Sequence, residues 1–312
     1  MDEKDIRTGD LIRNEMTGDD SFRPSFVLIG CPCDEGVSRN GGRTGAAGAP
    51  SGIREYFYRM TPPADRFETF LELAGKGVDL GDIPQAGMEQ MQYDLANRLS
   101  PWLKKRVPVV ILGGGHETSY GHYLGYRMAG LPHHIINMDA HADVRPLKRG
   151  VGHSGSPFRQ ILEEMDGCCL SYNAVGLQPH ANAKNHLAYI RKMGGEFYFR
   201  DQTERQLVSG YYSYSKERPR VMTTFDFDVL DQSEAPGVSA PCADGLSKTI
   251  LLEAVEMAGE NPAVASMDLV EVNPKYDRDG QTQRLAALAL WRFLSGLSRR
   301  SQGRATLNPS KI

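Results

Sequence analysis

The sequence predicts an α/β fold in which a parallel β-sheet is covered by helices on both faces. Apolar, β-branched runs alternate with longer amphipathic stretches, which is the pattern of repeated strand–helix–strand units. The runs are almost continuously apolar, as expected for parallel strands that are buried on both sides. We expect strands at residues 25–30, 107–112, 134–138, 173–177, 196–199, 220–225 and 264–269. We expect helices at residues 52–59, 89–105, 118–129, 181–192, 248–259 and 281–298.

The domain organisation is expected to be simple. With 312 residues the chain can bury a substantial core without disulfide bonds, and no internal repeat or low-complexity linker divides it. We expect one catalytic domain over residues 23–298. Residues 1–22 read as a loosely attached N-terminal extension, and residues 299–312 as a C-terminal tail.

Composition excludes several classes of partner. The net charge of −3 and the lack of a basic stripe argue against a nucleic-acid-binding protein. No apolar run approaches the roughly 20 residues that a membrane-spanning helix needs. Five cysteines without a regular framework favour a reducing compartment, so we expect a cytoplasmic protein.

A long glycine-rich segment follows the first expected strand, at residues 31–50. A loop of this length inside a compact domain is usually functional or mobile. Its glycines and arginines do not have the spacing of a phosphate-binding P-loop. We therefore interpret the segment as a lid over a substrate pocket.

Histidine and aspartate residues recur at the ends of three expected strands. Because ligands bind at the carboxyl ends of the strands in a parallel sheet, these side chains should converge. In an extended segment alternate residues point to the same side, which fits the spacing of both aspartate clusters. Oxygen-rich ligation with some imidazole suits manganese, so we predict a site for two Mn²⁺ ions. The predicted ligands are His116, Asp139, His141, Asp143, Asp226 and Asp228.

These motifs resemble the ureohydrolase family, which contains arginase, agmatinase and formimidoylglutamase. The resemblance rests on residues 113–116, 139–143, 225–231 and 267–274. It implies a three-layer α/β/α fold around about eight parallel strands, and a homo-oligomer, often a trimer or hexamer. It also implies that one manganese ion is held by His116, Asp139, Asp143 and Asp226, and the other by Asp139, His141, Asp226 and Asp228. Asp139 and Asp226 would bridge the two ions.

Two departures from the arginase and agmatinase pattern resemble the formimidoylglutamase branch. Gly115 stands where those enzymes usually carry an aspartate before the first metal histidine. Ser154 occupies the place of a histidine that serves as a proton shuttle in arginase, although the adjacent His153 could take part. The loop at residues 34–43 resembles the same branch.

Residues near the metal ligands predict a substrate that carries carboxylates. Arg145 follows Asp143 by two residues and should face the same side, where it can hold a carboxylate through paired charge-assisted hydrogen bonds. Glu271 would face the amidine-like nitrogen of the substrate, as the resemblance implies. Formimidoylglutamate carries two carboxylates, whereas agmatine carries none. Further candidates for binding the substrate are Asn40, Arg43, Ser154 and Arg159.

The expected reaction is hydrolysis of N-formimidoyl-L-glutamate to L-glutamate and formamide, a step of histidine degradation. A metal-bridging hydroxide would attack the formimino carbon, Asp228 would accept its proton, and Glu271 with the metals would stabilise the intermediate. One alternative is another ureohydrolase that converts a guanidino acid such as arginine or guanidinobutyrate to urea. A second is a non-catalytic scaffold homologue. Cys33 and Cys242 lie in loops that should border the same pocket, so they form a possible redox pair.

Overall fold

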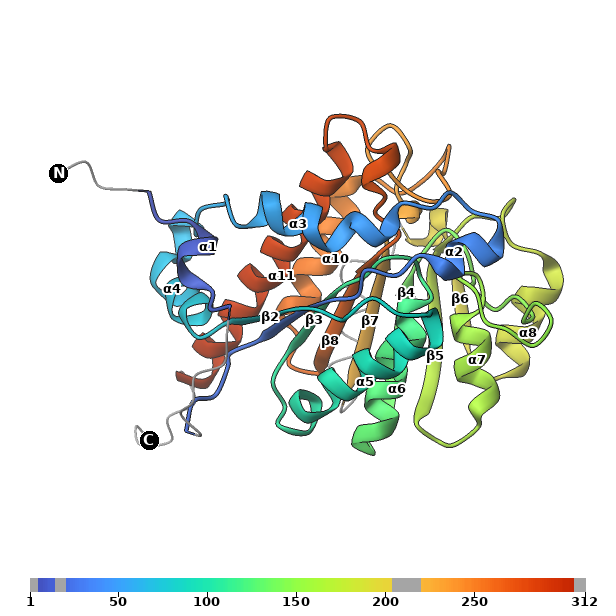
Figure 1. Ribbon diagram of the computed structural model, residues 1–312, viewed down its shortest axis with the longest axis horizontal. Coiled ribbons are helices and arrows are strands. Elements are labelled where there is room, and N and C mark those ends of the chain that lie inside the picture. The colour runs from blue at the N-terminus through green and yellow to red at the C-terminus, as the bar shows by residue number, and fades with distance from the viewer. Residues whose placement is uncertain (1–4, 15–20, 204–219, 306–312) are drawn as a thin grey trace.

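One sheet of eight parallel strands forms the centre of the molecule (Figure 1). The computed structural model describes residues 5–14, 21–203 and 220–305. Along the sheet the strand order is β2-β1-β3-β8-β7-β4-β5-β6. The strands are β1 (Val27–Gly30), β2 (Val78–Asp82), β3 (Val109–Leu112), β4 (His133–Met138), β5 (Cys169–Leu177), β6 (Glu196–Phe199), β7 (Val221–Asp226) and β8 (Val264–Val270). The predicted parallel sheet is confirmed.

Helices cover both faces of the sheet, which gives the expected three-layer α/β/α arrangement. One face packs against α3 (Ala49–Phe57), α4 (Phe67–Gly75), α10 (Lys248–Glu260) and α11 (Gln281–Ala305). The other face packs against α5 (Met88–Lys104), α6 (Thr118–Ala129), α7 (Pro157–Glu164) and α8 (Lys184–Lys192). In Figure 1 α5 and α6 lie in front of the strands, while α10 and α11 lie on their other side.

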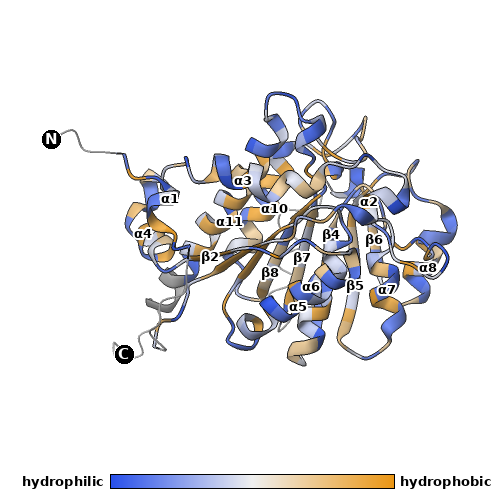
Figure 2. Ribbon diagram, viewed as in Figure 1, coloured by the Kyte–Doolittle hydropathy of each residue, from blue (hydrophilic) through white to orange (hydrophobic). Residues whose placement is uncertain are grey.

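Successive side chains of a strand point to opposite faces of the sheet, so the strands contribute to two separate hydrophobic cores. In β1, Val27 and Ile29 belong to the core beneath α5–α8, whereas Leu28 belongs to the core beneath α3, α4, α10 and α11. β3 repeats this division with Ile111 on one side and Leu112 on the other. Figure 2 shows the strands as predominantly hydrophobic. Burial on both faces therefore explains why the strands read as continuous apolar runs.

The eighth strand, β2, was not predicted from the sequence. It lies at the edge of the sheet, and only the first two of its five residues are buried. One of these is Asp79, whose carboxylate accepts hydrogen bonds from Arg54 Nε at 2.7 Å and Arg54 Nη2 at 3.0 Å. A buried aspartate paired in this way replaces an apolar residue, so the segment lacks the apolar run of a strand.

Several helices also fall where no helix was expected. The segment at residues 31–50 is partly helical, with α2 (Glu35–Asn40), the 3₁₀ turn η1 (Ala46–Gly48) and the start of α3. The short α1 (Thr8–Leu11), together with α4 and α7, was likewise missed. The remaining 3₁₀ turns are η2 (Ala64–Arg66), η3 (Phe227–Val229) and η4 (Pro274–Tyr276).

The described parts of both expected chain-end segments contact the domain or continue its helices. Within residues 5–14, Thr8 is buried and its hydroxyl donates to the Phe57 carbonyl, and the backbone of Arg13 pairs beside β2. Tertiary hydrogen bonds therefore fix this part of the extension. At the other end α11 continues to Ala305, past the expected boundary at residue 298. Residues 1–4, 15–20 and 306–312 lie outside the described residues.

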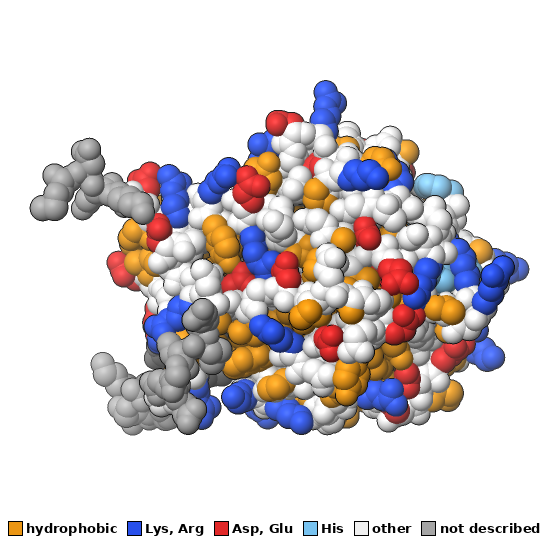
Figure 3. Space-filling model, viewed as in Figure 1, with side chains coloured by type: hydrophobic (Ala, Val, Ile, Leu, Met, Phe, Trp, Pro, Cys, Tyr) orange, Lys and Arg blue, Asp and Glu red, His pale blue; other side chains and the backbone are white. Residues whose placement is uncertain are grey.

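The surface carries charges of both signs. On the face drawn in Figure 3, lysine and arginine side chains are mixed with aspartate and glutamate, without a broad area of one sign. Such a mixture gives little electrostatic attraction for a polyanion. Among the described helices, none is long and apolar enough to cross a membrane.

Candidate metal centre

The six predicted metal ligands lie together at the carboxyl edge of the sheet. They follow β3, β4 and β7, and β8 runs between β3 and β7. Parallel strands direct the residues after their carboxyl ends toward one edge, which brings these segments together. The ligand atoms form two groups, and within each group they lie within 4.8 Å of one another. The groups are His116, Asp139, Asp143 and Asp226, and Asp139, His141 and Asp228.

The first group surrounds the ring of His116. Its Nδ1 lies 2.9 Å from Oδ2 of Asp226, 3.1 Å from Oδ2 of Asp143 and 3.3 Å from Oδ2 of Asp139. All four side chains are buried, yet Nδ1 makes no hydrogen bond of acceptable geometry. Burial opposes a charge on the ring, but the three carboxylates outweigh it and raise the pKa of His116 well above its usual range. The space between His116 Nδ1 and the three carboxylates therefore favours a cation.

The second group shares Asp139 with the first. His141 Nδ1 lies 3.1 Å from Oδ2 of Asp228 and 3.5 Å from Oδ1 of Asp139. Asp139 therefore offers one oxygen to each group, as expected of a bridging ligand. The other oxygen of Asp226, Oδ1, accepts a hydrogen bond of 2.7 Å from the Asp228 backbone amide. A bridging role of Asp226 stays a prediction.

The charges at this edge do not balance within the chain. Four carboxylates face two imidazoles, and most of these groups are buried. Burial, followed by the charges of Asp228 and Asp139, raises the pKa of Asp226 well above its usual range. Burial likewise raises the pKa of Asp228. Divalent cations would remove this repulsion, and oxygen-rich ligation with imidazole suits manganese. The residues therefore fit a pair of Mn²⁺ ions.

A buried chain of hydrogen bonds orients His116. Its Nε2 lies 3.0 Å from the hydroxyl of Thr224, which lies 3.3 Å from the hydroxyl of Ser119. Ser119 donates to Oδ2 of Asp268 at 2.9 Å. Because this uses the only hydroxyl proton of Ser119, Thr224 donates to Ser119 and accepts from Nε2–H of His116. In this tautomer the lone pair of Nδ1 is directed at the three carboxylates, as in a metal ligand.

A second arm of the chain reaches Asp268 from the opposite side. Nδ1 of His122 lies 2.8 Å from the same Oδ2 of Asp268. Nε2 of His122 lies 2.6 Å from the hydroxyl of Ser266, which in turn lies 2.6 Å from the hydroxyl of Tyr126. The sequence analysis missed this network. Its signal was a pair of polar residues, Ser266 and Asp268, inside an expected apolar strand.

Two buried glutamates adjoin the ligands. Glu271 follows β8, and its Oε1 accepts a 2.7 Å hydrogen bond from the His116 backbone amide. Its Oε2 is buried without a hydrogen-bond partner among the described residues. Burial, followed by the charge of Glu117, raises the pKa of Glu271 to about 8. Glu117, which the sequence analysis missed, accepts from the Gly36 amide at 2.8 Å, and burial raises its pKa to about 7.

Glycines before His116 allow these segments to approach closely. A Cβ at Gly114 would lie 1.8 Å from the carbonyl oxygen of Cys33, and a Cβ at Gly115 would lie 2.2 Å from Oε2 of Glu117. Neither position has room for a larger residue. The glycine run therefore allows Glu117 and the loop after β1 to reach the metal ligands.

A cavity of about 200 Å³ opens at the predicted centre. Its lining includes the predicted metal ligands His141, Asp143, Asp226 and Asp228 together with Glu271. Three of the predicted substrate-binding residues also line it and contact one another. Arg145 Nη1 donates to Oδ1 of Asn40 at 3.4 Å, and Nδ2 of Asn40 donates to the hydroxyl of Ser154 at 3.3 Å. Within the described chain, Arg145 has no carboxylate partner.

Two predicted substrate-binding arginines do not line this cavity. Arg43 donates to the backbone carbonyl of Val238 at 2.5 Å. Arg159 forms an ion pair with Glu163 at 2.5 Å, one helical turn away, and its guanidinium lies 3.7 Å from the centre of the Tyr189 ring. Both side chains are therefore engaged with other groups in this structure, and their contact with substrate stays a prediction.

His153 is also not part of the cavity lining. Its Nδ1 accepts a hydrogen bond from the Gly155 amide at 3.1 Å, and its Nε2 donates to the Pro146 carbonyl at 3.2 Å. Burial lowers the pKa of this histidine. With both ring nitrogens bound to backbone groups, His153 orders its own loop, so we do not retain it as a proton shuttle.

The two predicted redox cysteines are free thiols in this structure. Cys33 is buried after β1, where its carbonyl accepts from the Gly115 amide at 2.8 Å. Cys242 is buried in the loop after β7, where its carbonyl accepts from the Gln232 amide. Neither residue lines the cavity. Their pairing under oxidation stays a prediction.

A parallel α/β/α sheet whose carboxyl edge carries two acidic, histidine-containing groups indicates an α/β protein with a candidate binuclear metal site. The chain belongs to the arginase family, whose model matches residues 24–296. It is 37% identical to the formimidoylglutamase of Geobacillus thermodenitrificans, over 84% of this chain and 81% of that protein. It is 34% identical to the formimidoylglutamase of Lysinibacillus sphaericus, over 92% of this chain and 88% of that protein.

Solved structures of formiminoglutamase and arginase resemble this chain as well. The manganese-containing formiminoglutamase of Trypanosoma cruzi superposes with a TM-score of 0.85 at 28% identity, covering 95% of this chain and 100% of that one. The arginase of Bacillus subtilis superposes with a TM-score of 0.72 at 23% identity, covering 86% of this chain and 98% of that one, which supports the shared fold alone. The family predicted from the motifs is confirmed.

Proposed function

We propose that this enzyme hydrolyses N-formimidoyl-L-glutamate to L-glutamate and formamide, a step of histidine degradation. The observation that carries the proposal is Arg145, a cation on the wall of the cavity without a carboxylate partner among the described residues. A substrate carboxylate would supply that partner through paired hydrogen bonds. Relatives named formimidoylglutamase support the same substrate.

Water adds to the formimino carbon in this reaction, the bond from that carbon to the glutamate nitrogen breaks, and that nitrogen gains a proton. Bound manganese would supply Lewis acidity that lowers the pKa of water toward neutrality. Asp228 has a buried Oδ1 without a hydrogen-bond partner in the described chain, so this oxygen can accept the proton from water and return it to the departing amine.

Glu271 and the group around Arg145 would hold the two ends of the substrate. The unpartnered Oε2 of Glu271 can accept hydrogen bonds from the formimino nitrogens, which are donors when protonated. Arg145 would bind a carboxylate, with Asn40 and Ser154 as neighbouring polar contacts. The cavity therefore offers an acceptor for the amidine-like end and a cation for the acidic end.

Product analysis tests the proposal. Manganese-loaded enzyme is incubated separately with formimidoylglutamate, arginine, guanidinobutyrate and agmatine. We expect formamide and glutamate in equal amounts from the first, and little turnover of the others. Urea from arginine or guanidinobutyrate as the main product would replace the proposal with the alternative ureohydrolase activity.

Replacing Arg145 tests the carboxylate contact separately. We expect Arg145→Gln to raise KM at least tenfold with a smaller effect on kcat, because a charge-assisted pair that forms in the bound substrate is lost. Arg159→Gln removes the same charge from outside the cavity and serves as the matched control. Equal KM values for the two variants would contradict the assignment of Arg145.

A further inference from the structure

A second cavity lies at the opposite, amino edge of the sheet and has a volume of about 280 Å³. It opens where β3, β7 and β8 begin, and the ends of helices contribute to its wall. Its position separates it from the candidate metal centre, which lies beyond the carboxyl ends of the same strands. Nothing in the proposed reaction uses this cavity.

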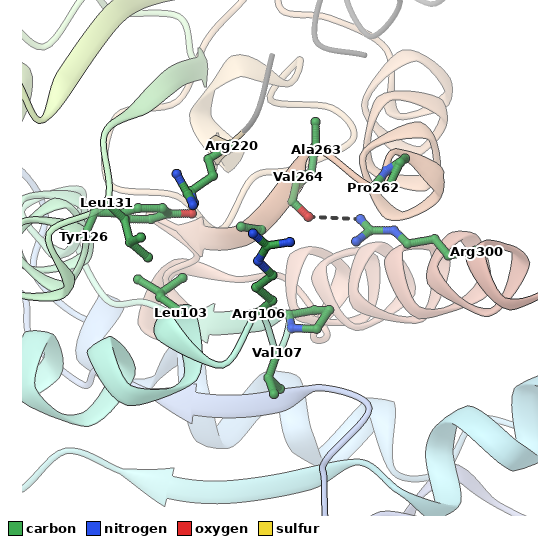
Figure 4. Close-up of a pocket in the computed structure, with 12 residues that line it drawn as sticks. Leu103, Arg106, Val107, Tyr126, Leu131, Arg220, Pro262, Ala263, Val264 and Arg300 are labelled. Atoms are coloured by element: carbon green, nitrogen blue, oxygen red, sulfur yellow. Dashed lines mark hydrogen bonds between the residues drawn. The ribbon is translucent and has the colours of Figure 1, made fainter. Parts of the chain in front are cut away.

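Three arginines line this second cavity, which we call the arginine cavity: Arg106, Arg220 and Arg300. Figure 4 shows their side chains entering the same space from three different parts of the chain. The other described lining residues are apolar, apart from Tyr126, and include no aspartate or glutamate. The described part of the wall therefore carries three positive charges and no negative one.

Arg300 is held in place without neutralisation. It donates to the carbonyl oxygens of Gly259, Ala258 and Val264 through Nε and Nη2, at 2.5, 3.0 and 3.1 Å. Its Nη1 has no hydrogen-bond partner among the described residues and remains available to the cavity. Burial lowers the pKa of this guanidinium to about 9. Backbone contacts fix the group, while its charge stays uncompensated.

Arg106 and Arg220 form no side-chain ion pair or hydrogen bond with the described part of the chain. Arg106 follows α5, and Arg220 directly precedes β7. In Figure 4 the guanidinium of Arg220 lies beside the hydroxyl of Tyr126. Of the three, Arg300 is the one that burial removes from water, and a charge there without a counterion is unfavourable. An anion in the cavity would supply that counterion, and Arg106 and Arg220 would add further donors.

We propose that the arginine cavity binds a small anion with at least two negative charges, of the phosphoryl or dicarboxylate type. Guanidinium groups match the oxygens of phosphate and carboxylate with paired hydrogen bonds. The volume suits a small metabolite, and the cationic wall favours multiple charges. The site is independent of the proposed substrate, because no residue lines both cavities.

Calorimetric titration tests the proposal on the manganese-loaded enzyme, with sulfate and succinate as probes and sodium chloride holding the ionic strength constant. We expect one equivalent of sulfate or succinate per chain, and the stronger of the two identifies the phosphoryl or the dicarboxylate class. The binding should persist in Arg145→Gln, which removes the cation of the other cavity.

Arg106→Gln and Arg220→Gln should each weaken binding at least tenfold, since each removes a charged hydrogen-bond donor. Lys105→Gln, which changes the same charge one residue from Arg106 and outside the cavity, should bind like the wild type. Arg106 is exposed, so its variant leaves the fold intact even where Arg220→Gln does not. Absence of binding to the wild type, or equal affinities of Arg106→Gln and Lys105→Gln, would overturn the proposal.

Discussion

Glu271 shows how a single residue is fixed for function. Its φ of 66° lies in the left-handed region, which is uncommon for a residue other than glycine. The backbone amide of Glu271 donates to the Gly114 carbonyl at 2.8 Å, and its carboxylate accepts from the His116 amide. These two contacts join the ends of β8 and β3. They hold the strained conformation in place and leave Oε2 without a partner among the described residues, in a side chain that lines the cavity.

Asp228 provides the test of proton transfer at the residue scale. We expect Asp228→Asn to lower kcat by about 10²- to 10⁴-fold, because an amide cannot accept the proton from water. Manganese content is measured in the same samples, since Asp228 is also a predicted ligand. Asp231→Asn, three residues further along the chain, is the matched control. Unchanged turnover with both metals bound would remove Asp228 from the mechanism.

The candidate metal ligands could be predicted from the sequence because aspartate and histidine occupy alternate positions directly after apolar strands. Glu117 was not predicted, because a glutamate just before a helix resembles an ordinary residue of a helix start. The present contacts of Arg43 and Arg159 were not predicted either, for a related reason. Their loops both predict that they lie near the cavity. A single sequence does not reveal that Arg43 instead donates to a backbone carbonyl and that Arg159 pairs with a neighbouring glutamate.

At the scale of elements, α6 connects the metal centre to the core. Ser119, His122 and Tyr126 follow one another at intervals of three and four, so they share one face of the helix. That face lies against the polar side chains of β7 and β8 and completes the hydrogen-bond chain to His116. The helix therefore orients the predicted ligand His116, which lies just before it in the chain, through Thr224 of β7.

Asp268 is the positioning residue of this network, and its replacement tests the role. We expect Asp268→Asn to lower manganese affinity about 10- to 100-fold without touching the metal, because a neutral amide oxygen accepts from Ser119 and His122 more weakly than a carboxylate does. Affinity is measured by calorimetry on protein whose circular dichroism matches the wild type. Tyr126→Phe, at the far end of the network, is the control. Wild-type affinity in Asp268→Asn would show that the network does not orient His116.

The elements found from the sequence share one property. Six of the seven predicted strands and the longer helices bury an apolar run or stripe, which can be recognised from the local sequence alone; the exception is the edge strand β6, whose aromatic residues are only half-buried. β2 and α2 depend instead on contacts made elsewhere. β2 buries Asp79 against Arg54, and the amide of Gly36 in α2 is bound by Glu117. Such pairings join residues far apart in the sequence, so local patterns do not report them.

Metal binding and the stability of the whole molecule should be coupled. Four carboxylates at the candidate centre repel one another, and ions that bind only the folded state stabilise it. We expect added Mn²⁺ to raise Tm, with a gain of about 2.7 kcal/mol for one site at a concentration 100 times its Kd. A chelator should reverse the shift, and His116→Ala should reduce it. An unchanged Tm would contradict the predicted centre.

His133 predicts an acid sensitivity of the folded state. It is fully buried, and burial lowers its pKa to about 3, below the unfolded value of about 6.5. Between these values the unfolded chain binds a proton that the folded chain does not. Stability contributed by the neutral ring is therefore present above pH 6.5 and is lost as the pH falls toward 3.

Chemical denaturation between pH 4 and 6 checks this expectation. The free energy of unfolding should fall with acidity more steeply in the wild type than in His133→Phe, by up to about 1.4 kcal/mol per pH unit. Phenylalanine retains a ring beside Tyr126, which stacks on His133 at 3.9 Å. His180→Gln replaces an exposed histidine and should keep the wild-type slope. Parallel slopes for the wild type and His133→Phe would contradict the assignment.

The hydrogen-bond chain through the sheet also connects the two edges of the molecule. From His116 it runs through Thr224 and Ser119 to Asp268, and from Tyr126 it runs through Ser266 and His122 to the same carboxylate oxygen. Tyr126 lines the arginine cavity at the amino edge, whereas His116 lies at the carboxyl edge. Asp268 is therefore the group through which the side chains at both edges share one support.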